Sequence, residues 1–145
     1  MQDNDDERSF GIKDLLSNWV YMLLVMSIAS LYFVLSGLQF WATAYLNEVM
    51  GAPLSQVFTY FVIICLTAPT LGILTSIVLF NCIGGYTSKY ALSLLLLFSA
   101  LTVLACLPVP VTVTASATYG LIWLIFFFIS AMLAPLIGIM LSQVP

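Results

Sequence analysis

Charged residues almost disappear from this sequence after its first fourteen positions. Of 145 residues, three are basic and six are acidic, and beyond Asp14 only Glu48 and Lys89 carry a charge. A soluble chain carries roughly 25% charged residues because its surface faces water. Here 6% of the residues are charged and 63% are hydrophobic. The sequence therefore predicts a protein embedded in a lipid bilayer.

Long apolar runs follow the acidic segment, and a helix needs about 20 such residues to cross a hydrocarbon core of about 30 Å. The predicted spans are residues 19–45, 57–80, 90–107 and 118–141. Polar residues, glycine and proline mark the connections, at residues 46–56, 81–89 and 108–117. The predicted fold is all-α, a polytopic transmembrane bundle of four spans within residues 18–145. Residues 1–17 form an acidic cytoplasmic tail and linker.

The ends and surroundings of the spans carry further signals. Ser17 and Asn18 offer N-cap chemistry immediately before the first run. The LSLLLLF core of residues 90–107 is apolar on every side, which predicts a helix at the periphery of the bundle.

The three basic residues predict the orientation in the membrane. Arg8 and Lys13 precede the first span and Lys89 lies between the second and third, so all three fall on one side of the bilayer. The other two connections contain no Lys or Arg. The positive-inside rule then places both termini and the connection at 81–89 in the cytoplasm.

Several function classes find no support in the sequence. It contains no histidine, and Cys65, Cys82 and Cys106 are far apart in apolar surroundings, where we expect buried small hydrophobic side chains without a metal or a disulfide. No Asp or Glu falls in a predicted span, so a general base for an intramembrane enzyme is missing. Three basic residues make no nucleic-acid-binding patch. We expect neither catalysis nor a cofactor.

Two spans carry small residues every four positions, a spacing that gathers them on one helix face where another backbone can approach closely. The predicted packing residues are Ala68, Gly72, Ser76, Ser130, Ala134 and Gly138. Pro69 lies in the first of these spans and should kink it by removing a backbone hydrogen bond. The hydroxyls of Thr67 and Thr70 are within reach of the carbonyl that the proline leaves free.

The first span has a polar face. At 100° per residue, Tyr32, Ser36, Gln39 and Thr43 fall within an arc of about 60°. A Gln39 amide facing lipid would leave its donors unpaired, so we expect it to face protein or a water-filled cavity. Two interpretations stay open at this point: a position that lines a solute path, and an interhelical hydrogen bond that only holds a bundle together.

Four stretches together resemble the C-terminal half of a major facilitator superfamily transporter, and of its spinster-like branch in particular. They read SGLQFWATAYL, TAPTLG, NCIGGY and APLIGIMLSQVP. The resemblance covers spans seven to ten of the usual twelve, and it equates the acidic tail with the family's central cytoplasmic linker. It implies secondary transport of a small organic or lipid-like solute by alternating access.

The resemblance also implies site residues. The solute path would be lined by Gln39, Trp41, Thr43, Tyr45 and Thr70. The gating turn would contain Asn81, Gly84 and Gly85. The family's turn reads G-x-x-x-D-R/K-x-G, and here Gly84 matches the closing glycine, while Asn81 replaces the acid, Cys82 the base and Ile77 the first glycine. These departures predict a weakened gate.

Other interpretations of the whole chain remain. No Asp, Glu, His, Lys or Arg lies within a predicted span, so proton coupling could not reside in this chain alone. Four spans are also too few for a two-lobed cavity, so we expect further transmembrane helices as partners. The alternative function is a non-transporting transmembrane scaffold subunit or a truncated, transporter-derived fragment.

Overall fold

The computed structural model describes residues 17–85 and 90–141, and it confirms the predicted all-α bundle of four spans. The helices are α2 (Trp19–Ala44), α3 (Leu54–Cys82), α4 (Ala91–Cys106) and α5 (Ala115–Leu141). A π-helical turn, η1 (Tyr45–Val49), continues α2, and a 3₁₀ turn, η2 (Val109–Val111), follows α4. Counted together with η1 and η2, the four helices are each long and apolar enough to cross a membrane, and the described residues contain no strand.

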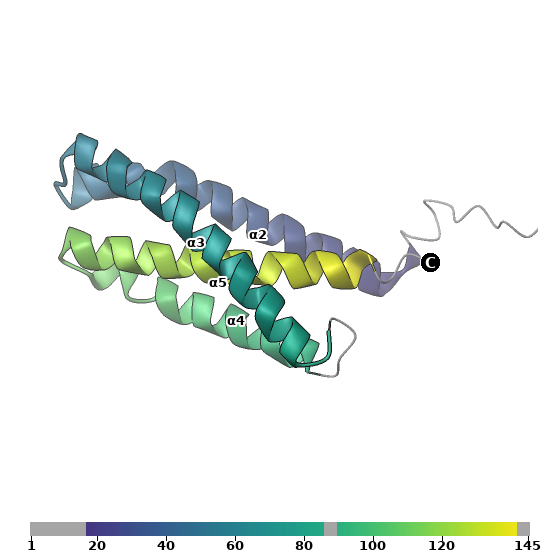
Figure 1. The fold of residues 1–145 in the computed structure, drawn as a ribbon. Coiled ribbons are helices and arrows are strands. Elements are labelled where there is room, and N and C mark those ends of the chain that lie inside the picture. The colour runs from purple at the N-terminus through teal and green to yellow at the C-terminus, as the bar shows by residue number, and fades with distance from the viewer. Residues whose placement is uncertain (1–16, 86–89, 142–145) are drawn as a thin grey trace, which may run out of the picture.

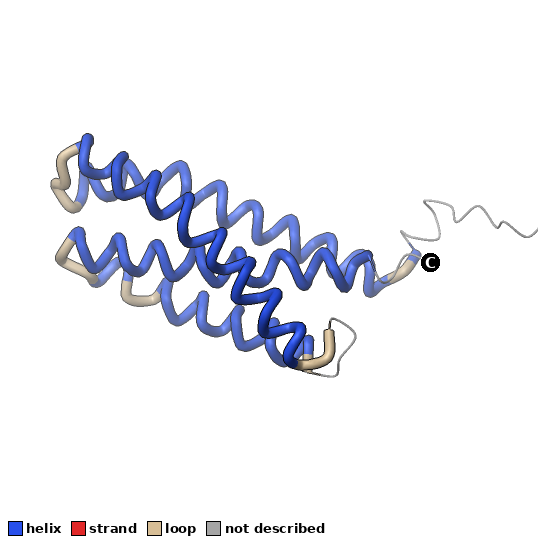
Figure 2. The backbone as a smooth tube through the Cα atoms, viewed as in Figure 1, coloured by secondary structure: helices blue, strands red, loops and turns tan. Residues whose placement is uncertain are grey.

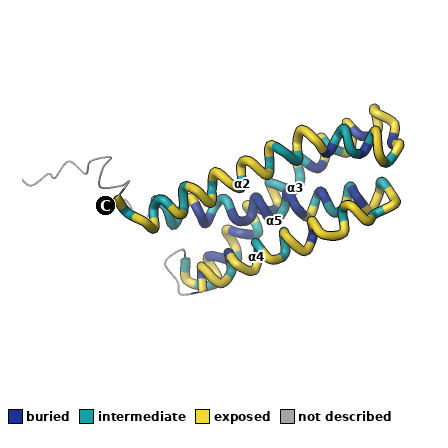
Figure 3. Tube along the Cα trace, turned by 180° about the vertical axis from the view of Figure 1, so that it is seen from behind, coloured by how far each residue is buried: buried dark blue, intermediate teal, exposed yellow. Residues whose placement is uncertain are grey.

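Consecutive helices run in opposite directions (Figures 1 and 2). The α2–α3 and α4–α5 connections lie at one end of the bundle, and the start of α2, the end of α3 and the end of α5 lie at the other. Helix α5 is central, since it packs against α3, α4 and α2, and α3 crosses it obliquely. The extensively buried residues of α5 form the core shared by the other three helices (Figure 3).

The first connection is much shorter than the predicted 46–56. The helix continues through Val49, and α3 begins at Leu54, so only four residues between them are not helical. Gly51 turns the chain at φ 65°, and the Asn47 side-chain amide donates to the Ala52 carbonyl over 2.9 Å. The polar residues that suggested a long loop therefore brace a tight turn. Similarly, α5 begins at Ala115, three residues earlier than predicted.

The other ends agree more closely with the sequence. Asn18 caps α2 as expected, because its Oδ1 accepts hydrogen bonds from the backbone N–H groups of Val20 and Tyr21. Helix α4 buries one narrow face against α5, including Leu95 and Phe98, and exposes four of its other leucines, as expected for a peripheral helix.

The expectation that the cysteines are buried was wrong for two of the three. Cys82 and Cys106 are exposed, and Cys65 is half-buried. In a membrane an outward position costs a thiol little, since lipid tails are as apolar as a protein core. In this chain, apolar neighbours in the sequence therefore do not predict that a cysteine is buried in the bundle.

Helices α3 and α5 approach each other closely through the small face of α3. Ala68, Gly72 and Ser76 are all buried. A Cβ at Gly72 would collide with the Phe127 carbonyl oxygen and would lie 3.2 Å from the Ala131 backbone nitrogen. On α5, Ser130 is buried, whereas Ala134 and Gly138 are half-buried. The α5 backbone that contacts Gly72 belongs to Phe127 and Ala131. This contact lies one position along the helix from the predicted stripe.

Candidate functional site

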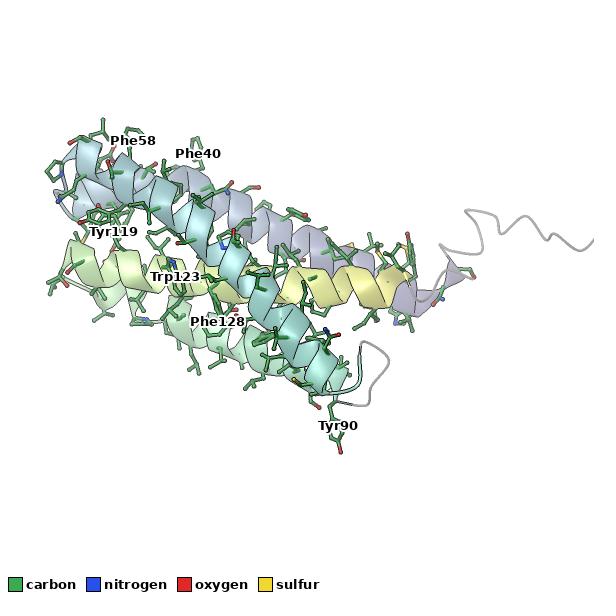
Figure 4. All side chains as sticks on the ribbon, in the orientation of Figure 1. Phe40, Phe58, Tyr90, Tyr119, Trp123 and Phe128 are labelled. Carbon is green, nitrogen blue, oxygen red and sulfur yellow. The ribbon has the colours of Figure 1, made fainter. Side chains whose placement is uncertain are left out.

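The polar face predicted on the first span is uncovered in the structure. We call Tyr32, Ser36, Gln39 and Thr43 the polar flank of α2. Tyr32, Ser36 and Gln39 are exposed, and Thr43 is half-buried with its hydroxyl 3.4 Å from the Phe40 carbonyl oxygen. Phe40, next to Gln39 in sequence, points away from the bundle (Figure 4). No helix of the described part covers this flank.

Of the residues in this flank, Gln39 has the most hydrogen-bonding groups to satisfy. Its side-chain amide makes no hydrogen bond with any described residue, and neither does the Ser36 hydroxyl. At 1.5 Å per residue, Gln39 lies about 9 Å deeper along the helix than Tyr45 and about 13 Å from the exposed Glu48. A serine hydroxyl can turn to a carbonyl of its own helix, but a glutamine amide has two donors and an acceptor to satisfy. The flank therefore requires polar surroundings.

Trp41 and Tyr45, also expected to line a solute path, lie on the other side of α2. Both border a small apolar cavity of about 210 Å³ with Val109 and Ile122. The Tyr45 hydroxyl donates to the Val109 carbonyl over 3.4 Å, which ties α2 to the turn after α4. The Trp41 ring packs edge-on against Phe40 with 5.2 Å between centroids. The structure thus separates these two residues from Gln39.

Thr70 is exposed on α3, and its hydroxyl donates to the Leu66 carbonyl over 2.7 Å. It is therefore already satisfied within its own helix. The predicted solute-lining residues occupy different faces of two helices, and the structure does not gather them around one cavity. Gln39 and Thr43 share one face of the first span, and Trp41 and Tyr45 share another.

Thr67 has a different role from the one predicted. Its hydroxyl donates to the Ile63 carbonyl over 2.8 Å and accepts from the Trp123 indole Nε1 over 2.9 Å. Figure 4 shows Trp123 between α5 and α3. The carbonyl left free by Pro69 is that of Cys65, four residues earlier, and neither Thr67 nor Thr70 reaches it. The sequence signal for the real contact was the indole itself, since a buried Trp N–H requires an acceptor.

The predicted gating turn has a well-defined helix end. The Gly85 N–H donates to the Phe80 carbonyl over 2.8 Å, and the Gly84 N–H donates to the Asn81 carbonyl. These are the two bonds of a Schellman motif, and φ values of 93° and 89° at the glycines suit it. Asn81 is exposed. Lys89 lies outside the described residues, as do Arg8 and Lys13.

No metal site is formed by the described residues, in which no three His, Cys, Asp or Glu side chains come together. Glu48 is the single charged side chain among them, and it is exposed on the η1 turn at the end of the first span. Comparison with protein-family models, with curated proteins and with solved structures gave no match to this chain.

Proposed function

We propose that this chain is part of a multi-pass membrane transporter that moves a small organic or lipid-like solute by alternating access. The observation that carries the proposal is the uncovered polar flank of α2 with its unpaired Gln39 amide. Facing hydrocarbon, such an amide would lose its hydrogen bonds with water at a cost of several kcal/mol. A water-filled path along this flank supplies the missing partners.

The likeness of four sequence stretches to the major facilitator superfamily supports the same assignment. In that family a half-transporter faces its other half across a central solute path, so an uncovered polar flank is expected on a chain with four of the twelve spans. The path on this chain would run along Tyr32, Ser36, Gln39 and Thr43. Both termini and the Asn81–Gly85 turn would be cytoplasmic by the positive-inside rule.

A second candidate is a non-transporting scaffold subunit, and a specific observation favours it. The described spans contain no Asp, His, Lys or Arg, and their one Glu, Glu48, lies at the end of η1, so they hold no buried carboxylate or histidine of the kind that usually couples transport to protons. In this case the polar flank of α2 would pack against polar side chains of another subunit's helix.

Two experiments separate these candidates. The first is uptake into proteoliposomes of a panel of labelled organic acids, amines and lysophospholipids, with the chain purified together with whatever subunits accompany it. Transport predicts uptake of at least one solute, reduced by Gln39→Leu and unaffected by Ser27→Ala, whose hydroxyl is already bonded to the Leu23 carbonyl. The absence of uptake for every solute contradicts it.

The second experiment is purification in mild detergent. A stoichiometric complex with unrelated membrane proteins, combined with an absence of uptake, favours the scaffold. Uptake by the chain alone or by a complex with a second transporter half favours transport.

A further inference from the structure

The two ends of the bundle are held together by different kinds of contact. We call the end with the α2–α3 and α4–α5 connections the connection end, and the end where α2 begins and where α3 and α5 finish the terminal end (Figure 1). In the half nearer the connection end, the Trp123 indole donates to the Thr67 hydroxyl and so joins α5 to α3. The Tyr45 hydroxyl donates to the Val109 carbonyl and so joins α2 to the turn after α4.

Two threonines extend these hydrogen bonds at the connection end. The Thr112 hydroxyl donates to the same Val109 carbonyl over 2.8 Å. It lies 2.9 Å from the hydroxyl of Thr118, a fully buried residue in the first turn of α5, which can donate to it. The end of α2, the turn after α4 and the start of α5 are therefore linked through polar groups.

At the terminal end the contacts between helices are apolar. A cluster of buried residues from α3, α4 and α5 forms the core there, and its members are Phe80, Ala91, Leu95, Phe98, Ala131, Met132 and Leu136. The hydroxyls of Ser27 and Thr75 donate to the Leu23 and Leu71 carbonyls of their own helices. The Ser76 hydroxyl, buried on the small face of α3, has no partner among the described residues.

These two kinds of contact differ in strength within a bilayer. Lipid tails are as apolar as leucine, so separating two apolar helix faces replaces one apolar contact by another at small cost. An indole or a hydroxyl that loses its partner in hydrocarbon finds no water to replace it. The connection end is therefore held more firmly than the terminal end.

Helix α3 has a weak point between the two halves. Pro69 has no N–H, so the carbonyl one turn earlier loses its hydrogen bond within the helix. Ala68, just before the proline, belongs to the core cluster of the connection end, and Phe80 belongs to that of the terminal end. Between them the buried residues of α3 are Gly72 and Ser76, whose side chains are too short to interlock with α5.

We propose that the bundle opens at its terminal end. Helix α3 bends at Pro69, and its second half moves relative to the start of α2 while the connection end stays closed. Figures 1 and 3 show that α3 already diverges from α2 toward the terminal end. The turn at Gly84, which ends α3, would move with this half. The opening is a property of this chain, and it does not depend on the polar flank of α2.

The test is the distance between paired nitroxide labels, measured by pulsed electron paramagnetic resonance on the full chain in phosphatidylcholine nanodiscs. The three native cysteines are first changed to alanine. Leu23→Cys with Val78→Cys reports on the terminal end, and Phe58→Cys with Val103→Cys reports on the connection end. All four positions are exposed. We expect the distance distribution of the terminal-end pair to be two-peaked or at least about twice as wide as that of the connection-end pair.

Two substitutions test the causes, each with a matched control. Pro69→Ala restores the missing hydrogen bond and should narrow the terminal-end distribution, whereas Pro53→Ala, at the N-cap of α3, should leave it unchanged. Thr67→Val removes the acceptor of the indole and should widen the connection-end distribution. Thr70→Val should not, because that hydroxyl bonds only to the Leu66 carbonyl of its own helix.

Three results would overturn the proposal. The first is equal widths for the two pairs in the wild-type chain, which would mean a bundle equally rigid or equally loose at both ends. The second is a Pro69→Ala chain whose terminal-end distribution is as wide as that of the wild type. The third is a connection-end distribution that Thr67→Val leaves unchanged. Solute uptake by a chain that gives any of these results would leave transport standing without this opening.

Discussion

The Trp123 indole on α5 donates a hydrogen bond to the Thr67 hydroxyl on α3, with 2.9 Å between Nε1 and Oγ1. The same hydroxyl donates to the Ile63 carbonyl, so one short chain of hydrogen bonds joins the two helices that pack most extensively. In a membrane neither group can turn to water as an alternative. This contact and the close approach at Gly72 together define how α3 crosses α5.

Thr67→Val should destabilise the bundle by about 0.5–1.5 kcal/mol, because it leaves the Trp123 N–H without its acceptor while preserving shape. Thr70→Val is the matched control, since the exposed Thr70 hydroxyl bonds only within its own helix. Both are measured by unfolding in mixed micelles with increasing dodecyl sulfate. Equal stability of the two variants would show that the indole contact contributes nothing.

Gly72→Ala should destabilise by about 1–3 kcal/mol, because the added methyl group forces α3 away from the Phe127 carbonyl. Gly37→Ala, in the middle of α2 with open space around it, should instead be neutral or stabilise by up to about 1 kcal/mol through better helix propensity. The same unfolding measurement compares them. A Gly72→Ala chain as stable as Gly37→Ala would disprove the close approach.

Gly84→Ala should cost about 1–2 kcal/mol, because φ 93° is unfavourable for a residue with a Cβ. The site has room for a methyl group, so the cost would come from the backbone alone. Gly120→Ala, within α5 and equally free of contacts, is the control and should not destabilise. If the two substitutions have the same effect on unfolding, Gly84 does not require its left-handed conformation.

Val62→Arg tests the membrane environment of α3. Val62 is exposed in the first half of the helix, so an arginine there should cost up to the about 2.5–3.5 kcal/mol that insertion scales give at a span centre. Val113→Arg, in the connection before α5 and 91% exposed, should be tolerated. Insertion is followed with glycosylation sites placed on either side of each span. Unimpaired insertion of Val62→Arg would argue that this face does not meet hydrocarbon.

The four spans were predictable because apolar runs of this length have few alternatives. The helix end at Gly84 and Gly85 was readable for a similar reason, since two adjacent glycines favour positive φ. The length of the connection at 46–56 could not be predicted in this way. It depends on the hydrogen bond from the Asn47 side chain to the Ala52 carbonyl, in a turn with only four non-helical residues. A polar residue can lengthen a loop or brace a turn, and composition alone does not distinguish these roles.

The site was less predictable than the fold. Trp41 and Gln39 are two positions apart, and 100° per residue already places them on nearly opposite sides of a helix. The family resemblance was based on the stretch SGLQFWATAYL as a whole, so it assigned both residues to the same solute path. The partner of Thr67 was also hidden, because Trp123 lies 56 residues along the chain, and only the crossing of α3 over α5 brings the two together.

Cysteine accessibility at position 39 is the most direct test of the account. In a chain with Cys65, Cys82 and Cys106 changed to alanine, Gln39→Cys is treated with a membrane-impermeant maleimide and compared with Val62→Cys on the outer face of α3. A water-filled path along the polar flank predicts rapid labelling of Gln39→Cys and little labelling of Val62→Cys. Labelling of Gln39→Cys as slow as that of Val62→Cys would contradict a solute path on this side of α2.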